Sequence, residues 1–210
     1  MQTTVTYIFD PLCGWCYGAS PAIQQLGQHP GIRLELLPSG LFSGGGRTME
    51  AAFADYAWSN DVRIAKLTGQ RFTEAYRTHV LGRHGSQFDS GAATLALTAV
   101  SLTEPQRELK TLNVLQEARY VHGQDSCDTA VVAQLLRDSG FSTAADRLVA
   151  GDADLHQANA ARVKRAQQLM HALGAQGVPV LVVKGQDGNR LLNGNLLYGS
   201  FDALLAQLDH

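Results

Sequence analysis

The spacing of apolar and polar residues changes twice along this chain. In the first section, residues 5–9 are rich in β-branched and aromatic side chains, which predicts a buried strand. Residues 32–37 alternate apolar with charged side chains, as a half-buried strand does. A helix is predicted between the two strands, from residue 17 to about residue 28. This strand–helix–strand order favours a parallel pair of strands joined by a right-handed crossover.

The middle section, from residue 48 to about residue 173, is predicted to be helical almost throughout. Apolar side chains recur there at intervals of three and four residues, as on the buried face of a helix. One helix is expected to open at the capping-box pattern over residues 103–106. Ser126 is expected to cap a shorter helix that ends at Gly140. A last long helix is predicted over residues 152–173.

Strand character returns in the last section. Residues 180–183 are apolar, residues 185–189 form a predicted turn, and residues 190–192 are the predicted partner strand of a hairpin. A helix over residues 201–208 closes the chain. The predicted order is therefore β-α-β, then a large all-helical insertion, then α-β-β-α, which is an α/β fold.

A length of 210 residues suits one domain that carries a large insertion. We expect residues 1–47 and 174–210 to form one α/β domain together. Residues 48–173 would form a helical insertion domain, with the last helix shared between the two.

Four residues, Cys13, Gly14, Trp15 and Cys16, follow the first strand and precede the first predicted helix. Two thiols three positions apart at the start of a helix are close enough to form a disulfide across one turn. The first of them lies where unpaired backbone N–H groups and the helix dipole stabilise an anion. Because the thiolate is the reactive form of cysteine, this placement suits dithiol–disulfide exchange.

Composition and charge narrow the class of protein. The chain is 45% apolar and 17% charged, enough to bury a sizeable core, and its net charge of -2 gives no electrostatic case for a nucleic-acid partner. No apolar segment approaches the ~20 residues that span a bilayer, and residues 1–4 lack the basic start of a signal peptide. We therefore expect a cytoplasmic protein that binds neither nucleic acid nor membranes.

Three cysteines in so long a chain are too few for a structural disulfide framework. In a reducing compartment, a CxxC pair is either redox-active or metal-binding. Zinc would need two further ligands at close spacing, and neither Cys127 nor the seven histidines supply them. We expect no metal site, a Cys127 that acts as a small apolar residue, and solvated histidines at positions 79, 84, 122 and 171.

The CxxC after the first strand and the Val178-Pro179 pair before a late strand resemble the DsbA-like branch of the thioredoxin fold. The resemblance covers essentially the whole chain and is carried by residues 9–18, the helical insertion and residues 177–179. More narrowly, the chain resembles cytosolic relatives described as protein-disulfide isomerases, which also resemble 2-hydroxychromene-2-carboxylate isomerases and kappa-class glutathione transferases. It implies a thioredoxin fold (β-α-β … α-β-β-α) with a large all-helical insertion.

The resemblance also implies roles for the matching positions. Cys13 would be the attacking, partly exposed cysteine, and the more buried Cys16 would resolve the mixed disulfide. Pro179 would be the cis-proline of the family and would face the dithiol. The backbone of Val178 would pair with an extended substrate segment.

Three further residues are candidates for substrate contact or for tuning the dithiol. Asp10 would relay protons or tune Cys13, although Asp-Pro is also an ordinary end to a strand. Trp15 would shield the sulfurs and contact substrate. The periplasmic oxidant of the family has Pro-His between its cysteines, whereas Gly14 and Trp15 offer no imidazole to stabilise a thiolate. We therefore expect a less oxidising couple.

The leading interpretation is a thiol–disulfide oxidoreductase of the reductase or isomerase type. Its substrate would be a protein or small-molecule disulfide, with no bound cofactor and with glutathione as reductant or co-substrate. A second interpretation is a glutathione-dependent isomerase or transferase that acts on a small aromatic substrate, although those relatives carry serine in place of the first cysteine. A third is a redox-inert protein that binds a metal or a partner through the CxxC pair.

Overall fold

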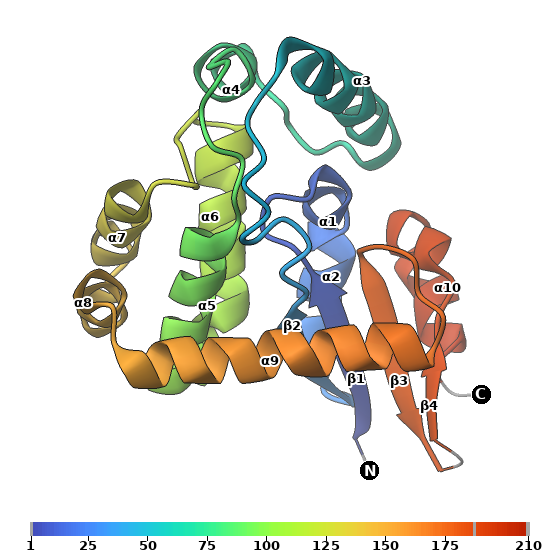
Figure 1. The fold of residues 1–210 in the computed structure, drawn as a ribbon. Coiled ribbons are helices and arrows are strands. Elements are labelled where there is room, and N and C mark those ends of the chain that lie inside the picture. Colours follow the sequence, from blue (N-terminus) through green and yellow to red (C-terminus); the bar gives the residue numbers. More distant parts are fainter. Residues whose placement is uncertain (1, 187, 209–210) are drawn as a thin grey trace.

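The computed structural model describes residues 2–186 and 188–208. Its centre is a four-stranded sheet in the order β2-β1-β3-β4 (Figure 1). The strands are β1 (Thr3–Phe9), β2 (Ile32–Pro38), β3 (Val180–Gly185) and β4 (Gly188–Leu191). The predicted parallel pairing of the first two strands is confirmed, and β3 is antiparallel to both β1 and β4. The turn predicted over residues 185–189 contains position 187, which lies outside the described residues.

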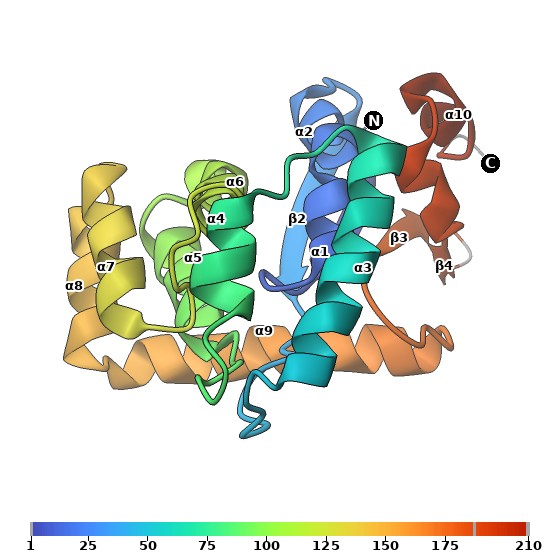
Figure 2. The ribbon, with the colours of Figure 1, turned by 90° about the horizontal axis from the view of Figure 1, so that it is seen from above.

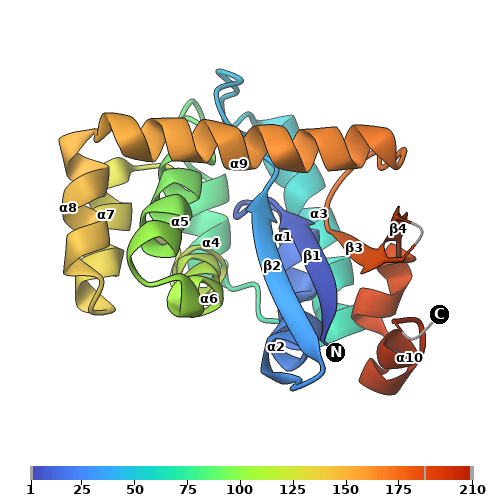
Figure 3. The same ribbon diagram turned by 90° about the horizontal axis from the view of Figure 1, so that it is seen from below.

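Helices cover both faces of this sheet. The long helix α9 (Ala153–Ala172) crosses one face and continues past the sheet to the other helices (Figures 1 and 3). The opposite face carries α1 (Gly14–Gly18), α2 (Ser20–Gln28) and α10 (Phe201–Ala206). Side chains alternate between the two faces as a period of two requires. Those packed towards α9 are Ile8, Leu37, Val180 and Val182.

The chain between β2 and β3 is mainly helical, as predicted. Its helices are α3 (Ala51–Thr68), α4 (Glu74–Tyr76), α5 (Gly91–Thr103), α6 (Glu108–Tyr120), α7 (Thr129–Asp138), α8 (Ser142–Ala150) and α9. The pattern did not predict α8. Seen from above, α3 runs beside α1 (Figure 2), and the two helices are in contact. The largest apolar cluster contains residues of the sheet and of α5 to α8, so one core joins them. The division into two domains stays a prediction.

The continuous helix predicted from residue 17 to residue 28 is wrong, because the chain forms two helices that meet at Ala19. Pro21 has no N–H, so it cannot donate to the carbonyl of Tyr17 four residues earlier. That carbonyl instead accepts from the hydroxyl of Ser20 at 2.7 Å and from Nε2 of Gln70 at 3.2 Å. The short α1 therefore ends just after the dithiol and is tied to the insertion.

Two of the predicted helix caps are also wrong. Asp128, and not Ser126, caps α7, since its Oδ1 accepts from the backbone N–H groups of Ala130 at 2.7 Å and Val131 at 3.4 Å. Ser126 is buried, and its hydroxyl has no hydrogen-bond partner among the described residues. The expected capping box at residues 103–106 lies at the end of α5, and a short 3-10 turn, Pro105–Arg107, leads into α6.

The remaining boundaries differ little from the predictions. The long helix predicted over residues 152–173 is confirmed as α9, and the carboxylate of Asp152 caps it by accepting from two backbone N–H groups. The closing helix ends at Ala206 rather than at residue 208. Among the described helices, none combines the length and apolar character that a bilayer span requires.

Candidate active site

The two cysteines predicted to form the redox site lie at the start of α1. Cys13 is the N-cap residue, with extended backbone angles of φ -88° and ψ 117°. The backbone N–H of Cys16 donates to the Cys13 sulfur at 3.4 Å, as a capping side chain requires. The N–H of Cys13 donates to the carbonyl of Asp10 at 3.1 Å, which fixes the turn between strand and helix. Both sulfurs belong to free thiols.

The late Val-Pro pair lies against the first of these cysteines. The peptide bond between Val178 and Pro179 is cis. The Sγ of Cys13 donates to the carbonyl oxygen of Val178 at 3.7 Å, although the two residues are 165 positions apart. The fold therefore brings together Cys13, Cys16, Val178 and Pro179, the four residues that the resemblance singled out.

The expectation of a partly exposed Cys13 is wrong, since 8% of the residue is accessible and it counts as buried. Cys16 is more buried, at 1%. Burial and the neighbouring Cys13 raise the pKa of the Cys16 thiol well above its ordinary value. Cys16 is thus held as a neutral thiol behind Cys13. Cys13 itself lines a cavity.

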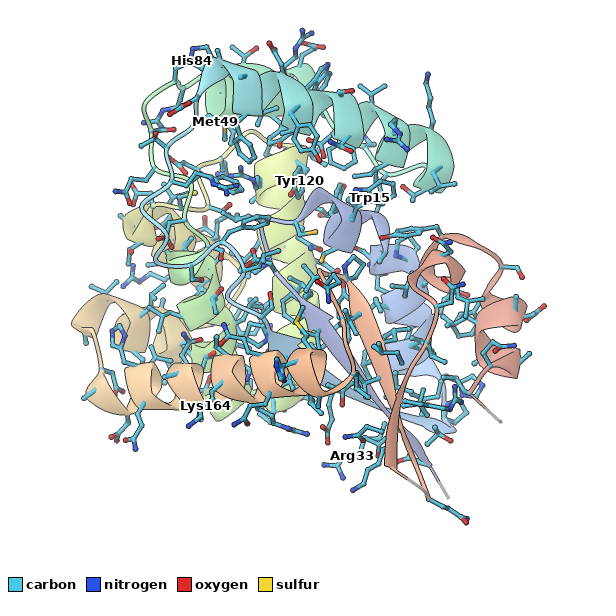
Figure 4. All side chains as sticks on the ribbon, turned by 45° about the vertical axis from the view of Figure 1, so that its right-hand side comes forward. Trp15, Arg33, Met49, His84, Tyr120 and Lys164 are labelled. Carbon is cyan, nitrogen blue, oxygen red and sulfur yellow. The ribbon has the colours of Figure 1, made fainter. Side chains whose placement is uncertain are left out.

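Three tyrosine hydroxyls hold the backbone around the dithiol. They come from β1, from α6 and from the 3-10 helix Gly194–Tyr198, and each donates to a carbonyl of the dithiol segment. The pairs are Tyr120 with Leu12 at 2.9 Å, Tyr198 with Trp15 at 3.1 Å and Tyr7 with Cys16 at 3.2 Å. Figure 4 shows Trp15 and Tyr120 at the ends of α1 and α6 that face α3. No spacing in the sequence indicates these contacts.

Asp10 lies at the end of β1 and is fully buried. Its carboxylate accepts from the backbone N–H of Leu12 at 2.9 Å, the backbone N–H of Phe42 at 3.1 Å and the hydroxyl of Ser90 at 2.9 Å. Burial raises its pKa, while these hydrogen bonds and the charge of Arg119 lower it. Asp10 thus binds the dithiol loop to two other segments, a role that neither of the two sequence-based interpretations contained, and a role in tuning the dithiol stays a prediction.

A cavity of about 250 Å³ opens in front of Cys13. Its walls are mainly apolar and aromatic, and they come from α1, α3, α4, α6, the loop after β2 and the Val178 segment. Trp15 is half-buried at its edge, and Tyr198 packs edge-on against Trp15 at 5.3 Å. Leu41 and Tyr56, at the mouth, are 51% and 66% exposed. Larger grooves of about 670 and 480 Å³ lie along β2, away from the dithiol.

Asp61 is the acidic side chain of this cavity, and sequence analysis missed it. It lies on α3, 4% exposed, with Oδ2 accepting from the hydroxyl of Tyr76 at 3.1 Å. Its Oδ1 occupies the space that a Cβ on Gly14 would need, which explains the glycine between the two cysteines. The available signal was its position in line with Ala54 and Ile64 at helical spacing, where an apolar residue is expected.

The other cysteine and the histidines lie apart from the dithiol. Cys127 is partly buried beside Arg119 and packs on the cluster of apolar residues that includes Tyr120. The histidines at positions 79, 84, 122 and 171 are exposed. Within residues 2–186 and 188–208, no group of three His, Cys, Asp or Glu side chains is placed to hold a metal ion.

The dithiol at a helix start, the facing Val-Pro pair and the inserted helices define a thioredoxin-fold oxidoreductase of the DsbA type. The profile of the family described as "DSBA-like thioredoxin domain" matches residues 4–206. The chain belongs to this family of disulfide oxidoreductases.

Solved structures show the same fold. The cytosolic disulfide reductase DsbM from Pseudomonas aeruginosa is 29% identical, with a TM-score of 0.86 over 98% of this chain and 97% of that one. A protein from Nitrosomonas europaea, described as a candidate protein disulfide isomerase, is 24% identical, with a TM-score of 0.80 over 99% of each chain. A 2-hydroxychromene-2-carboxylate isomerase is 14% identical, with a TM-score of 0.59 over 98% of this chain and 96% of that one. The comparison with curated proteins gave no match.

Proposed function

We propose that the chain reduces or isomerises disulfides with the dithiol formed by Cys13 and Cys16. The observation that carries this proposal is the position of the Cys13 sulfur at the cavity, between the Cys16 amide and the Val178 carbonyl. An N–H group directed at the sulfur stabilises negative charge on it, as an attacking thiolate requires. The Val178 segment offers backbone groups beside which an extended substrate would lie.

The exchange would proceed in two steps. The Cys13 thiolate attacks one sulfur of the substrate disulfide, forms a mixed disulfide and releases the first substrate thiolate, which takes up a proton. Cys16 then loses its proton, attacks the Cys13 sulfur and releases the second substrate thiol. The substrate disulfide is reduced to two thiols, and the dithiol is oxidised to a disulfide. Because burial keeps Cys16 protonated, we expect the second step to need a base or the departing thiolate as proton acceptor.

An external thiol must then reduce the protein again. We propose glutathione for this role and the cytosol as the compartment. The support is the similarity to the cytosolic reductase DsbM, a structure of which with GSH has a TM-score of 0.84 and 29% identity to this chain. The cavity of about 250 Å³ is smaller than the roughly 300–1,000 Å³ typical of sites that enclose a ligand. This size favours a disulfide presented at the cavity mouth over an enclosed aromatic substrate.

Three cysteine variants test the proposal. Cys13→Ser should abolish reduction of insulin disulfides, and Cys16→Ser should accumulate a mixed disulfide on Cys13 that mass spectrometry detects. Cys127→Ser is the matched control, and its rate should equal that of the wild type. Undiminished activity of Cys13→Ser would falsify the assignment.

The reduction potential of the dithiol decides whether the protein favours reducing substrate disulfides or forming them. We expect a value well below about −120 mV, the potential of the strong oxidants among these proteins. A potential near −120 mV would instead assign the protein to net oxidation.

A further inference from the structure

The cavity in front of Cys13 has one charged side chain among the described residues that line it. Asp61 is that residue, and the rest of the lining is apolar, aromatic, amide or backbone. Its Oδ2 accepts from Tyr76, and its Oδ1 packs directly on Gly14, the residue next to Cys13. The carboxyl group is therefore fixed against the residue that follows Cys13, in the cavity that Cys13 also lines.

The charge of Asp61 is offset in part by Arg119, which lies outside the cavity lining. In the described part of the chain, no Lys or Arg lies within ion-pair distance of Asp61. The neighbouring cation is Arg119 on α6, which is buried behind the aromatic wall, 5.6 Å from the ring centroid of Tyr76 and 5.8 Å from that of Tyr120. The field of Asp61 therefore acts on whatever enters the cavity.

We propose that Asp61 is a specificity-determining residue that selects disulfides by charge. The cavity would favour a disulfide whose neighbouring groups are apolar or positively charged, and it would disfavour one with a carboxylate close to the sulfur. This inference rests on the proposed function, because the selection acts at the attack of Cys13 on the substrate. A charge a few ångströms away in a partly buried cavity changes a rate constant by about tenfold.

The titratable and charged groups that face Asp61 are few. Tyr76 on α4, Tyr120 on α6, Tyr56 on α3 and Cys13 at the start of α1 line the cavity with Asp61, and Arg119 on α6 acts on it from behind the aromatic wall. Burial raises the pKa of Asp61 to about 7, while the hydrogen bond from Tyr76 and the charge of Arg119 lower it. The charge of the cavity, and with it the selection, should therefore increase as the pH rises through about 7.

Three small disulfides of similar size provide the test. Cystamine is doubly positive, dithiodipropionate is doubly negative, and hydroxyethyl disulfide is neutral. The protein is first reduced, freed of reductant and mixed with excess disulfide in a stopped-flow instrument. Oxidation of the dithiol is followed by the fluorescence of the two tryptophans, Trp15 and Trp58, and checked by acid quenching and mass spectrometry. The measured quantity is the rate constant for cystamine divided by that for dithiodipropionate.

The variant Asp61→Asn keeps the shape of the side chain and an acceptor for the Tyr76 hydroxyl. Because the charge changes the two rate constants in opposite directions by about tenfold each, the ratio at pH 8 should fall about a hundredfold in this variant and lose its increase between pH 6 and pH 8. Asp55→Asn is the matched control, because it removes the same charge from an exposed position on the same helix. The Asp55→Asn ratio should equal that of the wild type.

The outcomes separate the two proposals. If Asp61→Asn leaves the ratio and its pH dependence unchanged while the wild type oxidises through Cys13, selection by Asp61 is wrong and the proposed function stands. If Asp55→Asn lowers the ratio as much, general surface charge causes the selection, and Asp61 is not its source. If the wild type reacts no faster than Cys13→Ser with any of the three disulfides, both proposals are wrong.

Discussion

The Oδ1 of Asp61 fills the space directly above the α-carbon of Gly14, although the two residues lie on different helices. A methyl group at position 14 would overlap this oxygen and would also approach the Ile64 side chain to 3.3 Å. Asp61 cannot simply rotate away, since Tyr76 holds its other oxygen. The glycine in the dithiol is thus required by the packing of α3 on α1.

Gly14→Ala should therefore lower the free energy of unfolding by about 1–3 kcal/mol, the usual cost of overpacking. Urea denaturation of the reduced protein measures the change. Gly45→Ala is the control, because a Cβ at Gly45 meets no atom within 4 Å. Equal stability of the two variants would show that α3 can move away from the new methyl group without a loss of folding free energy.

The buried carboxyl of Asp61 should make stability depend on pH. Its pKa is about 7 in the folded protein and near 3.8 when unfolded, so the folded state binds more protons between these values. The contribution of Asp61 to the stability of the folded protein is thus greatest below about pH 4, and it is lost as the pH rises to about 7. The loss amounts to roughly 4 kcal/mol at most.

Asp61→Asn should remove this dependence and be more stable than the wild type at pH 8. Urea denaturation of both proteins at pH 5, 6, 7 and 8 gives the difference at each pH. A difference that stays constant over this range would contradict the raised pKa.

Asp10 should contribute strongly to stability. Asp10→Ala would remove the acceptor of the N–H groups of Leu12 and Phe42 and of the Ser90 hydroxyl, which keeps Ser43 as a partner. An unsatisfied buried group costs about 1–3 kcal/mol, so the two N–H groups predict a loss of at least about 2 kcal/mol. Ser90→Ala, which removes one of the three bonds, should cost about 1 kcal/mol. Thermal unfolding of Asp10→Ala, Ser90→Ala and the variant with both changes measures the three losses of stability. We expect the loss in the double variant to differ from the sum of the two single losses. Additive losses would be evidence against a shared hydrogen-bond network.

Two neighbouring residues test the corrected cap of α7. Asp128→Ala should cost about 1 kcal/mol, because two N–H groups at the helix start lose their acceptor. Ser126→Ala should be neutral or stabilising, since the buried Ser126 hydroxyl bonds to no group in the part of the chain that the structure describes. The midpoint of urea denaturation is compared between the two variants. If Ser126→Ala is the less stable of the two, Ser126 and not Asp128 is the cap.

Much of the fold was predictable because it depends on local spacing. β-branched and apolar runs identified β1 and β3, alternation of apolar with charged residues identified β2, and helical spacing identified the insertion. The predictions failed where a distant partner decides the outcome. The helix after the dithiol is broken because Pro21 leaves a carbonyl that Ser20 and Gln70 satisfy, and Gln70 belongs to the insertion.

The sequence by itself determined the dithiol and its place between strand and helix, because strand, thiols and helix are neighbours along the chain. It also predicted the Val178-Pro179 pair, through resemblance to a family. Only the tertiary structure decided how buried Cys13 is and which groups surround it. Asp61, Tyr120 and Tyr198 reach the dithiol from helices that are distant in sequence, and contacts of this kind follow from packing, which no local pattern of residues records.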